Sequence, residues 1–300
     1  MSSNLNEPWY IAGAGSIGLL IYQQLSQHQN CLLINRDVNE GKSSISFNSL
    51  SGATSRLQLN WFTPSTESEQ ISKVIITTKS HQVESCIAGL VPYLSENAQI
   101  VLLHNGLGAQ QRVISRWPEY NFFVATTTSG AWRDHDSLTH AGLGETLIGR
   151  LETHDKAPDN ITMLCHLLPN TQWSEDITTA LHLKVAINAS INPLTALYEC
   201  RNGELLDENT RQRQLTELSN ETQAVLNSYD IPVSDLLKKV LEVAHNTGNN
   251  FSSTYQDWKH GRKTELANMN GYIQQLAKEA GLKVPEHDKV MAILKDKVLL

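Results

Sequence analysis

The stretch Trp9-Tyr-Ile-Ala-Gly13-Ala-Gly15-Ser-Ile-Gly18 decides the fold of the first half of the chain. Its apolar start predicts a buried strand, and the apolar residues after the glycines are spaced as in a helix. A strand, a G-x-G-x-x-G turn and a helix in this order are typical of dinucleotide-binding domains. In such a turn the first glycine bends the chain, the second admits a pyrophosphate and the third lets the helix pack closely on the strand. The free N–H groups of the helix start attract phosphate. We therefore expect a phosphate-binding loop of Gly13, Ala14, Gly15, Ser16, Ile17 and Gly18.

The second predicted strand ends where a dinucleotide-binding domain meets the adenosine ribose. This strand is Cys31-Leu-Leu-Ile-Asn-Arg36. An acidic residue at its end would bind the 2′-hydroxyl of NAD, whereas an arginine holds the 2′-phosphate of NADP. Arg36 therefore favours NADPH. Asp37 follows it directly, so the alternative is an Arg–Asp turn exposed to water.

Polar or small residues follow further predicted strands. Lys79 comes after the apolar run at 74–78, and Asn105 comes after the run that ends at His104. Ligands of parallel sheets bind outside the carboxyl ends of the strands, so both side chains are candidates for contact with a cofactor or substrate. Taken singly, each could be an ordinary loop residue. Ala131 is small enough to let a nicotinamide ring approach. Residues 43–63 alternate apolar and polar around a glycine, which predicts a hairpin or two short strands.

Composition limits the class of protein. The chain has 300 residues, which suggests two domains. Its 24 basic and 31 acidic residues give a net charge of −7 without a basic block, which argues against nucleic acid and membrane surfaces as partners. The start of the chain lacks the features of a signal peptide, and no apolar run reaches the ~18–20 residues that span a bilayer. The four cysteines form no CxxC pair, which predicts free thiols in a reducing cytoplasm. The histidines lack metal-ligand spacing, so we expect no metal.

The most informative stretch for chemistry is Lys184-Val-Ala-Ile-Asn188-Ala-Ser-Ile-Asn192-Pro193. Its ammonium and two amides stand at i, i+4 and i+8, on one stripe of a helix. The residues around them are mostly apolar, so the polar groups should be buried and need partners. Pro193 has no N–H, so we expect the helix to kink or end there. Such a stripe suits a small polar ligand; an exposed polar stripe on a surface helix is the alternative.

The second half of the chain predicts helices. Pro158 and the segment 169–176 mark the boundary, which gives expected domains of 1–175 and 176–300. Ser253-x-x-Gln256 fits a capping box, an ordinary structural role for Ser253. Glu265 is expected in the first turn of a later helix, where a carboxylate complements the helix dipole.

The order of motifs resembles one family. The motifs are GAGSIG, TTKSHQ, HNGLG, KVAINASINPLTAL, CRNGEL, SSTYQD and GRKTEL, which run from about Trp9 to Pro285. Together they resemble 2-dehydropantoate 2-reductase (ketopantoate reductase). The resemblance implies an α/β, Rossmann-type N-terminal domain that binds NADPH and an all-helical C-terminal domain that carries the substrate. The sequence Lys79-Ser-His-Gln departs from the family's Lys-Ala-aromatic-Gln.

The resemblance also implies roles for single residues. The cofactor contacts would be Gly13 to Gly18, Arg36, Lys79, Asn105, Ala131 and Glu265. The catalytic residues would be Lys184 and Glu265. The substrate contacts would be Lys184, Asn188, Asn192, Asn202 and Ser253.

The implied reaction is the NADPH-dependent reduction of 2-dehydropantoate to (R)-pantoate, on the pantothenate route to coenzyme A. A cation such as Lys184 would stabilise the alkoxide that forms when hydride adds to the ketone, and would give it a proton. Two alternatives stay open: a reductase of another branched 2-keto or 3-hydroxy acid, and a regulator that binds NADPH without turnover. The expected partners are a keto acid and, in a homodimer, a second copy of the chain; a monomer is equally compatible with the sequence.

Overall fold

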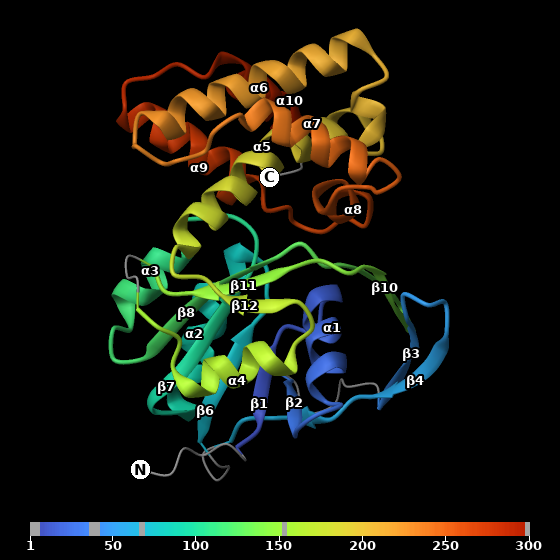
Figure 1. The fold of residues 1–300 in the computed structure, drawn as a ribbon, viewed down its shortest axis with the longest axis vertical. Helices are drawn as coiled ribbons and strands as arrows, with labels where there is room; N and C mark the ends of the chain where they lie inside the picture. The colour runs from blue at the N-terminus through green and yellow to red at the C-terminus, as the bar shows by residue number, and fades with distance from the viewer. Residues whose placement is uncertain (1–6, 36–42, 66–69, 152–154, 298–300) are drawn as a thin grey trace. The chain divides into compact units, whose positions relative to one another are not determined.

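The computed structural model describes residues 7–35, 43–65, 70–151 and 155–297. The chain divides into two compact units. The first consists of Met1–His104 and Ala109–Thr178, and the second of Asn105–Gly108 and Thr179–Leu300. In Figure 1 the first unit runs from blue to yellow-green, and the second, apart from Asn105–Gly108, runs from yellow to red. The four residues of Asn105–Gly108 thus group with the helices rather than with the sheet from which they emerge.

The first unit is built on a mixed sheet of eight strands. Across the sheet these are β12 (Thr171–Trp173), β11 (Thr146–Gly149), β8 (Asn121–Thr127), β7 (Leu94–Leu103), β6 (Ile71–Ile76), β1 (Trp9–Ala12), β2 (Cys31–Ile34) and β5 (Trp61–Phe62). Neighbouring strands are parallel except for the antiparallel pair of β8 and β11. The helices of this unit are α1 (Ser16–Leu25), α2 (Val83–Leu90), α3 (Ala109–Arg116) and α4 (Asp159–Leu167). Strands β1 and β6 are almost wholly buried, as in sheets covered on both faces. The expected Rossmann-type α/β fold is confirmed.

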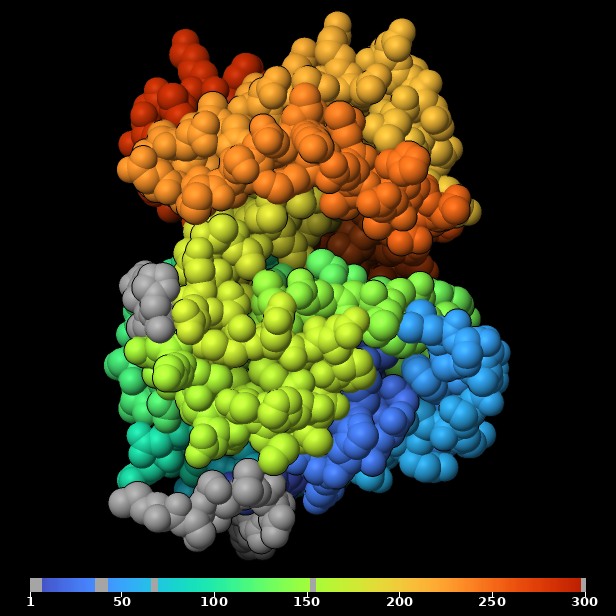
Figure 2. All heavy atoms as spheres, in the orientation of Figure 1, coloured from blue at the N-terminus to red at the C-terminus, as the bar shows by residue number. Residues whose placement is uncertain are grey.

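A second, four-stranded sheet belongs to the same unit. Its order is β4 (Thr54–Gln58), β3 (Ser44–Asn48), β10 (Ser137–Gly142) and β9 (Gly130–Asp134). The β3–β4 pair is the hairpin predicted within residues 43–63. Helix α1 contacts β9 and β10, so its apolar residues share one core with both sheets. Figure 2 shows the remaining surface of α1, in dark blue, between the light-blue hairpin and the yellow-green residues around α4.

The described residues of the second unit form helices joined by loops, with no strand among them. Its helices are α5 (Ile177–Tyr198), α6 (Asn209–Asn227), α7 (Leu236–Asn246), α8 (Ser253–Lys259), α9 (Leu266–Glu279) and α10 (Pro285–Asp296). Short 3₁₀ turns complete the chain: η1 (Ser80–Gln82) and η2 (Val91–Tyr93) in the first unit, and η3 (Gly203–Leu205) in the second. The prediction of an all-helical C-terminal part is confirmed.

The sequence led us to expect a kink or an end of the helix at Pro193; the helix does not end there, because α5 continues to Tyr198. Proline has no backbone N–H, so residue 193 cannot donate the helical hydrogen bond to the Ala189 carbonyl. That carbonyl instead accepts a hydrogen bond of 2.7 Å from Nδ2 of Asn270, on α9. The donor that replaces the missing N–H comes from another helix, so the chain can remain helical through the proline.

The four cysteines, Cys31, Cys86, Cys165 and Cys200, are buried free thiols, as predicted. Among the described helices, none combines the length and apolar character that crossing a bilayer requires.

Candidate active site

The glycine turn after β1 has the geometry that its motif predicts. Gly13 has φ +116°, and a Cβ at this position would lie 2.8 Å from the carbonyl carbon of Thr77. A Cβ on Gly18 would lie 1.8 Å from the Gly13 carbonyl oxygen, so the start of α1 packs against the turn as only glycine allows. A Cβ on Gly15 would meet no atom within 4 Å. The space beside Gly15, at the N-terminus of α1, fits the pyrophosphate of a dinucleotide.

Two residues that the sequence did not point to hold this turn in place. The Thr77 hydroxyl, just past β6, donates to the Gly13 carbonyl at 2.7 Å. Arg133 of β9 donates from its guanidinium to the Ala14 carbonyl at 2.6 Å. Thr77 lies in the quoted TTKSHQ motif, so its place at a strand end was a usable signal. Arg133 offered none, because it reaches the turn through the second sheet.

The other cofactor candidates of the first unit lie on separate elements. Lys79 is partly buried and directly precedes η1. Ala131 is partly buried within β9, two residues before Arg133 and in register with His140 of β10. Arg36, the proposed ligand of the 2′-phosphate, lies outside the described residues, as does Asp37. The cofactor roles of these residues remain predictions.

Helix α5 carries the polar stripe that the sequence predicted. The uninterrupted helix brings Lys184, Asn188 and Asn192 to one face, at successive turns. Lys184 and Asn188 are partly buried, and Asn192 is 6% exposed. Burial lowers the pKa of Lys184 to about 8, while the negative charge of Glu265 acts in the opposite direction and raises it. The amine is therefore poised to hold or release a proton near neutral pH.

Glu265 lies in a different position from the one predicted. It caps α9 instead of standing in its first turn, and its side chain makes no capping hydrogen bond. The carboxylate, 3% exposed, accepts a hydrogen bond of 3.2 Å from Nδ2 of Asn105. The charge of this buried carboxylate raises the pKa of Lys184.

The loop that carries Asn105 approaches α9 very closely. Leu107 donates its N–H to the Asn268 carbonyl at 2.9 Å. Gly106 has φ +83°, and a Cβ there would lie 2.7 Å from the Asn268 side chain and carbonyl. A glycine at 106 is thus required for Asn105 to reach Glu265.

The helix cap at α8 corrects a second expectation. Ser252, not Ser253, is the N-cap: its hydroxyl accepts the Tyr255 N–H at 3.1 Å. The Ser252 hydroxyl also lies 2.7 Å from that of Thr195, which bonds the Asn192 carbonyl at 2.9 Å. Ser253 is exposed and free of the capping role, so it stays available as a substrate contact.

Asn202 is a further candidate for contact with the substrate, because its side-chain oxygen has no hydrogen-bond partner among the described residues. Its Nδ2 donates to the Thr247 hydroxyl at 2.8 Å, and its N–H donates to the Asn250 carbonyl at 3.0 Å. Its Oδ1 is buried and has no hydrogen-bond partner among the described residues. An unpaired buried acceptor of this kind suits a ligand hydroxyl.

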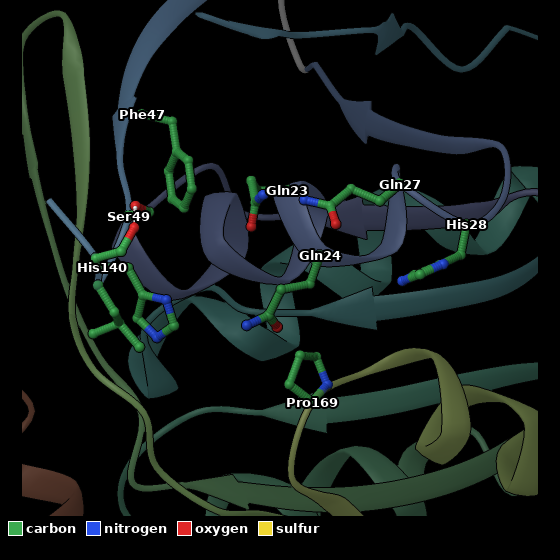
Figure 3. Close-up of a pocket in the computed structure, with 10 residues that line it drawn as sticks. Gln23, Gln24, Gln27, His28, Phe47, Ser49, His140 and Pro169 are labelled. Atoms are coloured by element: carbon green, nitrogen blue, oxygen red, sulfur yellow. Dashed lines mark hydrogen bonds between the residues drawn. The ribbon is translucent and has the colours of Figure 1, made fainter. Parts of the chain in front are cut away.

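A hollow elsewhere on the first unit does not involve these residues. It has a volume of about 370 Å³ and opens beside α1. Figure 3 shows Gln23, Gln24 and Gln27 along the helix, facing Phe47 and His140. None of the candidate site residues lines this hollow.

Comparison with known proteins identifies the family. Residues 9–153 match the profile described as Ketopantoate reductase PanE/ApbA, and residues 176–298 match Ketopantoate reductase PanE/ApbA C terminal. The chain belongs to the ketopantoate reductase family. The resemblance seen in the sequence motifs is thereby confirmed.

Relatives in the family span most of the chain. A 2-dehydropantoate 2-reductase of Yersinia pestis is 33% identical over 232 residues, covering 76% of this chain and 75% of its own. A protein of Schizosaccharomyces pombe, named as a probable 2-dehydropantoate 2-reductase, is 28% identical and covers 98% of this chain and 97% of its own.

Solved structures share the fold at lower identity. A D-mandelate dehydrogenase with NADH and anilino(oxo)acetate has a TM-score of 0.86 at 22% identity, covering 97% of this chain and 98% of its own. A ketopantoate reductase of Ralstonia eutropha has a TM-score of 0.85 at 21% identity, with the same coverage. At these identities the likeness establishes the fold.

Proposed function

We propose that the chain is an oxidoreductase acting on a CH–OH group, which reduces 2-dehydropantoate to (R)-pantoate with NADPH. The observation that carries the proposal is Lys184 on α5, with a pKa lowered to about 8 beside Glu265. Two amides follow it at one-turn intervals, in a chain of the ketopantoate reductase family.

Lys184 is the proposed catalytic acid. When bound, NADPH supplies a hydride to the carbon of the substrate's ketone, and negative charge develops on the ketone oxygen. The Lys184 ammonium would stabilise that charge and donate a proton from Nζ to the oxygen. A pKa of about 8 keeps the amine mostly protonated at neutral pH while easing proton transfer. Glu265 would sustain the protonated form through its charge, held in place by Asn105.

The amides of the second unit are the proposed substrate contacts. Asn188 and Asn192 would bind the hydroxyl and carboxylate of the keto acid, next to Lys184. Asn202 offers its unpaired Oδ1 as an acceptor for a hydroxyl, and Ser253 offers an exposed hydroxyl. 2-Dehydropantoate carries both a carboxylate and a terminal hydroxyl, so this set of donors and acceptors matches its chemistry.

The glycine turn of the first unit is the proposed site of the NADPH pyrophosphate, supported by the open space beside Gly15. Lys79, Asn105, Ala131 and Glu265 are the further proposed contacts, and Arg36 the proposed reader of the 2′-phosphate. In this proposal residues 1–175 form the domain that binds NADPH. Residues 176–300 carry the side chains that bind the substrate and catalyse the reaction.

We further propose that the protein acts in the cytoplasm, on the pantothenate route, as a monomer or homodimer. Four buried free thiols agree with a reducing compartment. A dimeric ketopantoate reductase of Staphylococcus aureus shares the fold with a TM-score of 0.81, so a dimer is compatible with this architecture.

Steady-state oxidation of NADPH, followed by loss of its absorbance, tests the function. We expect turnover with 2-dehydropantoate, and a kcat/KM higher with NADPH than with NADH. With 2-oxoisovalerate, which lacks the terminal hydroxymethyl group, kcat/KM should fall by more than the ~10–200-fold that a missing methylene explains. Higher kcat/KM with another keto acid would indicate a related reductase. NADPH binding without turnover on any keto acid would indicate a regulator.

A further inference from the structure

Pro193 removes a hydrogen bond from the helix that carries the proposed catalytic lysine. A backbone N–H at position 193 would donate to the Ala189 carbonyl, but proline has none and its ring crowds that carbonyl. Ala189 directly follows Asn188 and precedes Asn192 by three residues. The open carbonyl therefore belongs to the same turn of α5 as the two amides proposed to bind the substrate.

Asn270 of α9 supplies the missing donor. Its Nδ2 lies 2.7 Å from the Ala189 carbonyl oxygen, and the side chain is 0% exposed. The bond is therefore shielded from bulk solvent. The same helix is capped by Glu265, so the bond joins the helix of the proposed catalytic carboxylate to the helix of the lysine.

His287 of α10 sets the direction in which the Asn270 amide points. Its Nδ1 lies 3.2 Å from Asn270 Nδ2, and its Nε2 lies 2.9 Å from the Thr222 hydroxyl. An amide nitrogen carries two hydrogens, one for the Ala189 carbonyl and one for an unprotonated Nδ1. A flipped amide would place its oxygen against both acceptors. Burial lowers the pKa of His287 to about 4, so the ring is neutral at neutral pH, and in the tautomer that carries its hydrogen on Nε2 the Nδ1 atom is the acceptor.

We propose that Asn270 is a positioning residue for the reaction: by bonding the carbonyl that Pro193 leaves open, it holds the turn of α5 that presents Asn188 and Asn192 to the substrate. This inference rests on the proposed function. Asn270 itself touches no reacting atom in the proposal, and His287 and Thr222 serve to orient its amide.

The proline provides a direct test, because Pro193→Ala restores the backbone donor to Ala189. We expect Asn270→Ala to lower kcat/KM for 2-dehydropantoate by roughly 10-fold, through both kcat and KM, which corresponds to about 1.4 kcal/mol. The Kd for NADPH, measured by fluorescence titration, should stay unchanged. In the Pro193→Ala background, Asn270→Ala should lower kcat/KM by less than about 3-fold, because the carbonyl then has a second donor.

Ser219→Ala is the matched control. Ser219 is also 0% exposed and also donates to a helix carbonyl, that of Leu215 at 2.7 Å, but its helix has no proline there. Its replacement should leave kcat/KM unchanged. Asn270→Leu keeps the number and branching of the side-chain heavy atoms without the donor and should act as Asn270→Ala does. If both variants fail to fold, we expect the same substitutions to give folded, active protein in the Pro193→Ala background. Failure to fold in that background as well would overturn the inference.

Two results contradict the positioning role while leaving the proposed function intact. One is an equal loss of kcat/KM from Asn270→Ala in the wild-type and Pro193→Ala backgrounds. The other is a lower Tm with kcat and KM both unchanged, which would make Asn270 a purely structural residue. A wild-type chain that does not turn over 2-dehydropantoate instead overturns the proposed function, and this inference with it.

Discussion

Nδ2 of Asn105 lies 3.2 Å from Oε2 of Glu265, a contact between residues 160 positions apart in the chain. The loop after β7 and the cap of α9 therefore meet at one buried carboxylate. The same carboxylate raises the pKa of Lys184 against the stronger effect of burial. Glu265 is thus held by an amide while its charge acts on the ammonium.

Removing the charge of Glu265 should shift the pH dependence of the reaction. Glu265→Gln keeps the size of the side chain and removes the charge that raises the pKa of Lys184. That pKa should then fall below about 8, so the decline of kcat on the alkaline side moves to lower pH. The pH profile of NADPH oxidation with saturating 2-dehydropantoate measures the shift. An alkaline limb at its wild-type position would show that Glu265 does not act on the catalytic acid.

The wild-type profile itself carries a prediction. Burial disfavours the charged amine and lowers the pKa of Lys184 from 10.5 to about 8, so the protonated fraction declines as the pH rises through 8. We expect kcat for ketone reduction to be level below that pH and to decline above it. Lys184→Arg keeps a permanent charge, so this variant should be slower and lack the limb. A limb that persists in Lys184→Arg would assign the titration to another group.

Replacing each of the two serines at the start of α8 should have different effects, one on stability and the other on substrate binding. Ser252→Ala removes the cap of the helix and should lower stability by ~1 kcal/mol, seen as a lower Tm. Ser253→Ala, one residue on and exposed, should leave Tm unchanged and raise KM for the keto acid. Thermal unfolding and steady-state kinetics on both variants make the comparison. A Tm loss from Ser253→Ala, with KM unchanged, would reverse the assignment.

The packing of α1 against the glycine turn predicts a steric effect at Gly18. A Cβ there would lie 1.8 Å from the Gly13 carbonyl oxygen, so Gly18→Ala should displace the turn, lower Tm and weaken NADPH binding. Gly89 is the control, since a Cβ on it meets nothing within 4 Å in helix α2. Gly89→Ala should keep NADPH affinity and leave stability unchanged or raised by ~0.5–1 kcal/mol. Normal NADPH affinity in a folded Gly18→Ala variant would argue against the proposed cofactor site.

Local patterns in the sequence were enough to predict the parts of the fold that depend on local physics. The glycine turn, the strands that precede Lys79 and Asn105, and the stripe on α5 each follow from neighbouring residues. The family could be named from the order of motifs. The joining of the β3–β4 hairpin to β9 and β10 was not predicted, because that pairing is set by distant contacts.

The errors have the same physical origin. Of the kink or end predicted at Pro193, the end is wrong, and the sequence could not show this because the donor on Asn270 lies in another helix. The sequence predicted a capping role for Ser253, although either serine of the pair can cap and only the backbone decides that Ser252 does. It placed Glu265 in a first turn, one residue beyond its position as cap of α9.

The kinetics of Lys184→Ala test the central claim most directly. With 2-dehydropantoate and NADPH, kcat should fall by ~10²–10⁴-fold because the reaction loses both its acid and its alkoxide stabiliser. The NADPH Kd and the Tm should show that the variant still folds and binds its cofactor. A kcat within a few-fold of the wild type would contradict the assignment of Lys184 as the catalytic acid.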